Sequence, residues 1–151
     1  YLDTLDEPTV LVFFGDHRPN LGTACTELGL RYNLNETPQD TVDTYAVPYV
    51  IWSNEAYASA VDLPARYAAL ALPENGYLSD NYLGAMVLQL IGYHGQSAFF
   101  DELNALRAEL PVLREREAAY CLADGTYTDT LPPELAAAVS RLHKWTYYLL
   151  K

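Results

Sequence analysis

The sequence predicts a mixed α/β fold in which a small sheet is packed with helices. Two apolar runs rich in β-branched and aromatic residues, 9–14 and 49–52, have the composition of strands. Farther along the chain, apolar residues recur at spacings of three and four, the period of an α-helix with one buried face. Because 50% of the 151 residues are hydrophobic, the chain can form a core, and the composition argues against disorder.

The first half of the chain is expected to hold both strands. The run 9–14 is apolar throughout, which is typical of a strand buried on both faces. A short helix is expected at 23–30, and the segment 33–43, rich in Asn, Thr, Pro and Asp, is expected to be a surface loop. Pro48 then starts the second strand, 49–52, because proline is tolerated at the first residue of a strand.

The second half is expected to be mainly helical. Ser79 is a good N-cap for a helix over 79–91, and further helices are expected over 97–110 and 133–150. Between them, 120–128 indicates a small hairpin with Asp-Gly at its centre. Each helix has one apolar face, so we expect the helices to pack on the sheet. The last helix is expected to bury a stripe of Ala138, Leu142, Trp145 and Leu149.

Asp16 and His17 directly follow the first apolar run and are the candidate metal ligands. Gly15 permits a turn there, and Pro19 prevents the strand from continuing, so two neighbouring side chains can converge on one ion. A carboxylate oxygen and an imidazole nitrogen are common ligands of divalent metals. The alternative interpretation of the same residues is an Asx-type turn with an exposed histidine.

Five segments of the chain, taken in order, carry a family resemblance. They read TVLVFFGDHRP at 9–19, VPYVIWSN at 47–54, SDNYLG at 79–84, FFDELNALRAELP at 99–111 and YCLADG at 120–125. This order resembles the C-terminal part of the sulfatase-like domain of the lipoteichoic acid synthase family. These enzymes are phosphoglycerol transferases of the alkaline phosphatase superfamily, so the resemblance implies an alkaline-phosphatase-like fold.

The resemblance implies that Asp16 and His17 are ligands of the catalytic divalent metal, with manganese or magnesium favoured over zinc. The family's Glu ligand and Thr nucleophile lie farther toward the N-terminus, and only eight residues precede the first strand here. We therefore expect residues 1–151 to be one partial domain, the C-terminal segment of a larger catalytic domain, with no catalytic residue of its own. Since two ligands supply half a site, the chain alone is expected to be inactive and to hold an ion poorly or not at all. No role is transferred to Arg18, because its position in the motif is variable.

For the intact parent, the resemblance implies that a Thr hydroxyl activated by the metal attacks a phosphodiester and forms a covalent intermediate. The implied substrate is an anionic glycerolipid such as phosphatidylglycerol, whose glycerol phosphate passes to a cell-surface polymer or glycan. A sulfate- or phosphate-ester hydrolase of the same superfamily and a non-catalytic cell-surface binding module stay open as alternatives. The parent is expected to be membrane-anchored, with its catalytic domain outside the cell. The implied partner of this chain is the N-terminal part of that domain.

Charge and cysteine content restrict the remaining possibilities. Nine basic and 20 acidic residues give a net charge of −11, which argues against non-specific binding to nucleic acid or anionic lipid.

No apolar run reaches the roughly 20 residues that span a bilayer, so this piece is expected to be soluble. Strand edges without partners would favour dimerisation of the isolated piece. Cys25 and Cys121 are either a disulfide or, as we favour, two apolar fillers. His94 and His143 are expected to be solvated or packed rather than ligands.

Overall fold

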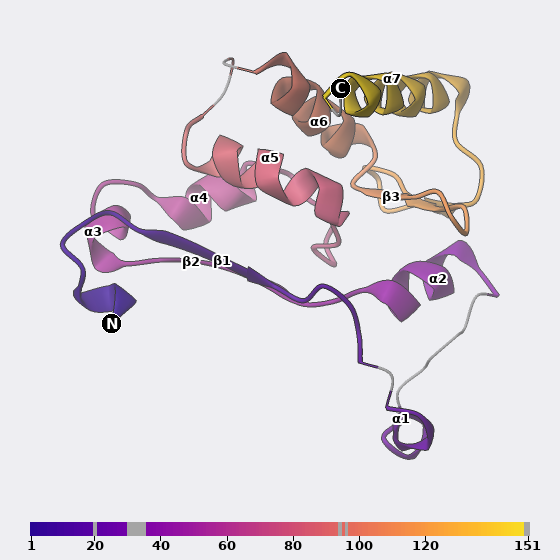
Figure 1. Ribbon diagram of the computed structural model, residues 1–151, viewed down its shortest axis with the longest axis horizontal. Helices are drawn as coiled ribbons and strands as arrows, with labels where there is room; N and C mark the ends of the chain where they lie inside the picture. Colours follow the sequence, from indigo (N-terminus) through magenta and orange to yellow (C-terminus); the bar gives the residue numbers. More distant parts are fainter. Residues whose placement is uncertain (20, 30–35, 94, 96, 150–151) are drawn as a thin grey trace.

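The computed structural model has a mixed α/β fold with two small antiparallel sheets packed with helices, which confirms the expected fold class (Figure 1). One sheet has the strand order β1-β2, and the other has the order β3-β4-β5. The structure describes residues 1–19, 21–29, 36–93, 95 and 97–149. Among these residues, no helix combines the length and the apolar character needed to cross a membrane.

The order of the elements follows the sequence prediction closely in the second half of the chain. In chain order they are η1 (Leu2–Thr4), β1 (Val10–Phe14), α1 (Thr23–Glu27), α2 (Pro38–Tyr45), β2 (Tyr49–Ser53), α3 (Glu55–Ala58), α4 (Leu63–Ala68), α5 (Asp80–Leu90), α6 (Ala98–Glu109), β3 (Val112–Arg114), β4 (Ala119–Cys121), β5 (Tyr127–Thr128) and α7 (Pro133–Leu149). The predicted hairpin is formed by β4 and β5. Position 94 and the end of the last predicted helix, at 150, lie outside the described residues.

The strands β1 and β2 form an antiparallel pair in which Val12 lies opposite Ile51. One face of this pair packs on the helices, because Val12, Ile51 and Tyr49 contact a core cluster built around Met86 and Leu90 of α5. Hydrogen bonding continues past the end of β1, where the Gly15 amide donates to the Pro48 carbonyl oxygen at 3.1 Å. The pairing therefore fixes the point at which the chain leaves the sheet.

The expectation that the first strand is buried on both faces is wrong. The outward face of the pair carries Leu11, Phe13 and Val50, which are 41%, 67% and 54% exposed. These side chains share one face because Leu11 lies opposite Trp52 and Phe13 lies opposite Val50. Within the described residues only the inward face is covered by helices, so the apolar pattern of the strands exceeds what this chain buries.

The expected surface loop over 33–43 is also wrong where the structure describes it. Positions 33–35 lie outside the described residues, but Pro38–Tyr45 is the helix α2. Its start is a capping box: Thr37 Oγ1 accepts from the Asp40 amide, and Asp40 Oδ2 accepts from the Thr37 amide, each at 3.1 Å. Thr, Pro and Asp are common in loops, but at these spacings they are the residues that begin a helix. Val42 of this helix is buried in a small core cluster with Cys121 of β4.

The C-terminal half is held together by helix packing. The helices α5, α6 and α7 bury a shared cluster that includes Tyr82, Leu106 and Leu142. Ser79 occupies the N-cap position of α5, as predicted, but its side chain bonds to Leu113 and makes no cap hydrogen bond. One prediction about the last helix is wrong. Leu149, expected in the buried stripe of α7, is 59% exposed, because the last turn of the helix extends beyond the core.

Cys25 and Cys121 are both buried free thiols, as expected of apolar fillers. Burial raises the pKa of the Cys121 thiol, which keeps it in the unreactive protonated form.

Asn54 closes the end of the β1–β2 pair that is distant from Gly15. It is fully buried, and its Oδ1 accepts from the amides of Thr9 (2.9 Å) and Tyr57 (3.0 Å). Its Nδ2 donates to the carbonyl oxygens of Leu5 (3.0 Å) and Glu7 (2.8 Å). One amide side chain therefore caps α3 and ties the segment before β1 to the end of β2.

We predict that Asn54→Ala lowers the free energy of unfolding by about 3 kcal/mol, because it leaves two buried amides and two carbonyls without their partner. Asn54→Asp should be destabilising as well, since a carboxylate cannot donate to the two carbonyls. Urea unfolding followed by tryptophan fluorescence measures the change. Asn81→Ala, at an exposed position of α5, serves as the control and should change stability by less than about 0.5 kcal/mol. Equal stability of the Asn54 and Asn81 variants would contradict this role.

Candidate functional site

The candidate site begins at Gly15, directly after β1. The glycine lies against Val47, two residues before β2. A Cβ atom at position 15 would lie 3.1 Å from the Val47 Cβ. A side chain at this position would therefore push the chain away from β2. The next residues are held in turn: Arg18 Nε donates to the Ala46 carbonyl oxygen at 2.6 Å. The segment 15–18 is thus attached at both ends to the residues that precede β2.

Asp16 and His17 lie in this segment with their side chains side by side. Asp16 Oδ1 accepts from the His17 amide at 2.8 Å, and the His17 Nδ1 is 3.2 Å from the Arg18 carbonyl oxygen. Since a carbonyl oxygen only accepts, Nδ1 is the donor, and in the neutral ring this tautomer leaves the lone pair on Nε2. The other carboxylate oxygen, Asp16 Oδ2, lies 3.6 Å from His17 Nε2. The side chains are 85% and 77% exposed.

This donor set fits a divalent metal ion. The two remaining atoms are one carboxylate oxygen and one unprotonated imidazole nitrogen, both good ligands. Two ligands about 2.1 Å from one ion lie about 3.0 Å apart in an octahedral site and about 3.4 Å apart in a tetrahedral one, so these atoms, 3.6 Å apart, need to approach by a few tenths of an ångström to share an ion. The contact from Nδ1 to a carbonyl is also the usual support of a ligating histidine, because it fixes the ring and its tautomer. Among the described residues, no group of three or more His, Cys, Asp or Glu side chains is arranged to hold an ion.

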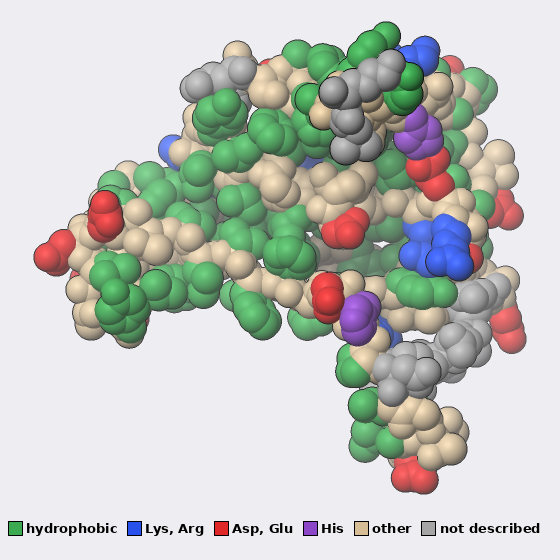
Figure 2. Space-filling model, in the orientation of Figure 1, with side chains coloured by type: hydrophobic (Ala, Val, Ile, Leu, Met, Phe, Trp, Pro, Cys, Tyr) green, Lys and Arg blue, Asp and Glu red, His purple; other side chains and the backbone are tan. Residues whose placement is uncertain are grey.

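The pair lines an open cleft of about 1450 Å³. Its walls are the segment after β1, the helix α2 with the residues that follow it, the residues before α5, and the strand β3 with the turn after it. Figure 2 shows this face hollowed beside a cluster of basic side chains, drawn in blue. The cleft is large enough for a ligand of drug-like size, and charged side chains of both signs border it.

Arginine side chains contribute positive charge to the cleft. The Arg114 guanidinium stacks on the Tyr45 ring at 3.5 Å and forms an ion pair with Glu117. Arg116 is 89% exposed. Burial and the hydrogen bond to Asp43 raise the pKa of Tyr77. The positive charge of Arg18 lies close enough to oppose this rise. Arg114 and Arg116 both pair with Glu117, so Arg18 is the arginine that would add positive charge for an anionic ligand beside Asp16 and His17.

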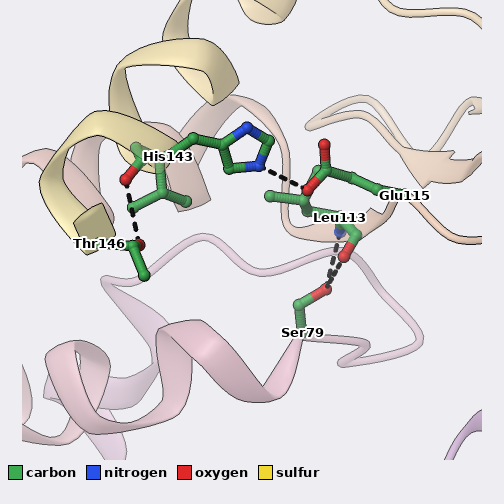
Figure 3. A network of polar contacts seen from close by, with 6 residues as sticks. Ser79, Leu113, Glu115, His143 and Thr146 are labelled. Atoms are coloured by element: carbon green, nitrogen blue, oxygen red, sulfur yellow. Dashed lines mark hydrogen bonds and ion pairs between the residues drawn. The ribbon is translucent and has the colours of Figure 1, made fainter. Parts of the chain in front are cut away.

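A polar network joins the cleft to the last helix (Figure 3). Ser79 Oγ accepts from the Leu113 amide at 2.7 Å and donates to the Leu113 carbonyl oxygen at 3.2 Å, which ties the start of α5 to β3. On the turn after β3, Glu115 Oε2 accepts from His143 Nε2 of α7 at 2.7 Å. His143 therefore packs through an ion pair rather than acting as a ligand of the candidate site.

The sequence prediction identified Asp16 and His17 but missed the rest of the cleft. Further acidic side chains border it: Glu36, Asp40, Asp80 and Glu115. The alternating sequence Arg-Glu-Arg-Glu at 114–117 was the one visible signal for the wall at β3. Nothing in the local sequence indicates that this segment lies near residue 16, because the two are almost 100 positions apart.

The comparisons with known proteins give one match. A family model described as Sulfatase matches residues 1–93, which include both Asp16 and His17. Neither the curated proteins nor the solved structures include a significant match. An alkaline-phosphatase-like domain is consistent with the mixed α/β fold.

We predict that Gly15→Val destabilises the chain by about 2 kcal/mol and displaces the Asp16–His17 pair, because its side chain would overlap Val47. Thermal unfolding measures the first effect, and the amide NMR shifts of residues 16 and 17 measure the second. Gly84→Ala is the matched control: no atom lies within 4 Å of the added Cβ, and alanine favours the helix α5. Unchanged shifts at 16 and 17 in Gly15→Val would show that the close approach to Val47 does not position the pair.

Proposed function

The chain belongs to the sulfatase family, and we propose that it contributes two metal ligands, Asp16 and His17, to an enzyme site that transfers phosphate- or sulfate-type ester groups. The observation that carries this proposal is the pairing of Asp16 Oδ2 with His17 Nε2, 3.6 Å apart and both available to one ion. A nucleophile and further ligands would come from a part of the enzyme outside residues 1–151.

The residues of this chain have distinct tasks in such a site. Asp16 and His17 hold the ion, and the contact of Nδ1 with the Arg18 carbonyl keeps the ring in the ligating tautomer. A bound divalent ion supplies positive charge that stabilises the transferred group and lowers the pKa of a nucleophilic hydroxyl. Arg18, anchored on Ala46, adds a positive charge at the same place. The cleft gives the rest of the substrate room to bind.

Within this class we propose phosphoglycerol transfer as the reaction of the intact enzyme. The support is the resemblance to the lipoteichoic acid synthase family, which extends over the segments 99–111 and 120–125, beyond the matched residues 1–93. The donor would be an anionic glycerolipid, and the acceptor a cell-surface polymer or glycan. Such an enzyme would be anchored in the membrane with this domain on the outer side, and manganese or magnesium would be the preferred ion.

A sulfatase-type hydrolase is the second candidate, because the family-model match is described by that name. Both candidates would use the same two metal ligands, Asp16 and His17, so residues in other parts of the enzyme decide between them. The distinguishing experiment incubates the full-length enzyme with fluorescent phosphatidylglycerol and with a chromogenic sulfate ester, each in the presence of manganese. Release of diacylglycerol supports transfer, and release of sulfate supports hydrolysis. Turnover of neither substrate would favour a non-catalytic cell-surface module.

We also propose that the exposed outward face of β1–β2 packs against the rest of the catalytic domain. Its exposed members, Leu11, Phe13 and Val50, form a continuous apolar surface on paired strands. Strands that are apolar on both faces are typical of sheets covered on both sides. The partner of this face is therefore expected to be another layer of the same enzyme.

We predict that Asp16→Ala or His17→Ala in the full-length enzyme lowers activity at least about a hundredfold and reduces the bound metal, since each removes a direct ligand. Activity against the phosphodiester and metal content by mass spectrometry are measured together. Asp6→Asn, an exposed acidic residue outside the cleft, is the control and should change neither. Full activity with normal metal content in both ligand variants would refute the assignment.

A further prediction concerns Phe13 on the outward face. In the isolated chain, Phe13→Ser should change the free energy of unfolding by less than about 0.5 kcal/mol, because the side chain is 67% exposed. In the complete enzyme it should cost about 3 kcal/mol, since the ring would be buried. Phe100→Ser, in the helical core, should destabilise both.

Denaturant unfolding of the two proteins, with and without the substitution, measures the difference. A small effect of Phe13→Ser in both would show that the face stays exposed in the complete enzyme. Loss of a dimer of the isolated chain, with no effect in the complete enzyme, would assign the face to a second copy instead.

A further inference from the structure

The end of the chain differs in charge from the rest of it. The whole protein has a net charge of −11, yet residues 135–151 contain three basic residues and no acidic one. Both lysines of the protein, Lys144 and Lys151, belong to this segment. Basic residues near the end of a helix are favourable for its dipole, but that effect does not account for the aromatic residues placed among them.

The structure exposes those aromatic residues on the last turn of α7. Leu142 is the last buried residue of the helix, and Trp145 still packs on Phe99 with ring centroids 6.1 Å apart. Beyond it, the exposed fractions of Tyr147, Tyr148 and Leu149 are 59%, 71% and 59%. The rings of Tyr147 and Tyr148 meet edge to face, with centroids 6.0 Å apart. Lys144 lies one helical turn before both rings, so basic and aromatic side chains share this end of the helix.

We propose that this surface, the last turn of α7 with Lys144, docks on an anionic phospholipid membrane. Tyrosine rings with a polar tip are favoured at the boundary between lipid headgroups and hydrocarbon, and leucine adds apolar area below them. Lysine is attracted to the negative surface of the headgroups. This inference is independent of the proposed reaction, because it does not involve Asp16 or His17.

The net negative charge of the protein does not prevent such docking. Charges are screened over about 8 Å at physiological ionic strength, so only those near the membrane surface count. Two acidic residues contact α7: Glu102 accepts from Arg141 at 3.0 Å and from Trp145 Nε1, and Glu115 accepts from His143 at 2.7 Å. Each of these carboxylates is bonded to a side chain of the helix, and Lys144 lies between the two contacts in sequence. The membrane therefore meets an aromatic helix end that carries Lys144, while Arg141 is paired with Glu102.

The helix that carries the docking surface also contacts the wall of the cleft. The hydrogen bond from His143 to Glu115 joins α7 to the turn after β3, which borders the cleft (Figure 3). The last helix and the wall of the cleft are therefore in direct contact.

The test is cosedimentation of the purified chain with two kinds of vesicle, phosphatidylcholine alone and phosphatidylcholine mixed with phosphatidylglycerol, at low and high salt. We expect binding to the anionic vesicles that weakens with salt. The double variant Tyr147→Ser/Tyr148→Ser should weaken it at least about tenfold, and Lys144→Glu about fivefold or more. The control variant Tyr1→Ser/Leu28→Ser removes exposed apolar side chains elsewhere and should bind like the wild type.

Circular dichroism melts show whether each variant is folded, so a loss of binding can be read directly. No binding to anionic vesicles, equal binding to both kinds of vesicle, or unchanged binding by the α7 variants would each overturn the proposal. Sedimentation equilibrium supplies a further check. A dimer that the tyrosine variant dissociates, without vesicle binding by the wild type, would make the surface a contact between two copies and would also overturn the proposal.

Discussion

The antiparallel pairing of β1 with β2 is the constraint on which the candidate site depends. Adjacent residues of a strand point to opposite faces, so Asp16 and His17 can approach each other only after the strand has ended. The pairing ends at Gly15, whose amide still bonds to Pro48 and whose missing side chain lets the chain lie against Val47. The buried Asn54 holds the opposite end of the same pair. The position of the two candidate ligands is therefore set by contacts made several residues away from them.

Much of the fold could be predicted because its signals are local. The apolar runs, the helical spacing over 97–110 and the Asp-Gly turn each lie within one element, and each element is present. The helix α2 was missed because Thr37, Pro38 and Asp40 are as common in loops as at helix starts, and their spacing had to decide. The apolar residues of β1 on both faces predict burial on both sides, but the structure buries only the inward face, because the described residues supply no second layer over Leu11 and Phe13.

The candidate site was predictable in part for the same reason. Asp16 and His17 are neighbours in sequence, so their convergence follows from a turn at Gly15. The wall formed by Arg114 and Glu115 depends on how β3 is placed by Ser79 and by the helices. Such a contact depends on the tertiary packing of three-residue strands, which are too short to show a periodic pattern. The family-model match covers both Asp16 and His17, and their Oδ2 and Nε2 atoms lie 3.6 Å apart.

The central claim is that one divalent ion binds between Asp16 Oδ2 and His17 Nε2. Anomalous X-ray diffraction at the manganese absorption edge, on crystals of the complete catalytic domain grown with manganese, tests it most directly. The account predicts an anomalous peak within about 2.3 Å of both atoms. A strong manganese peak elsewhere in the domain, with Asp16 and His17 turned away from it, would contradict the account.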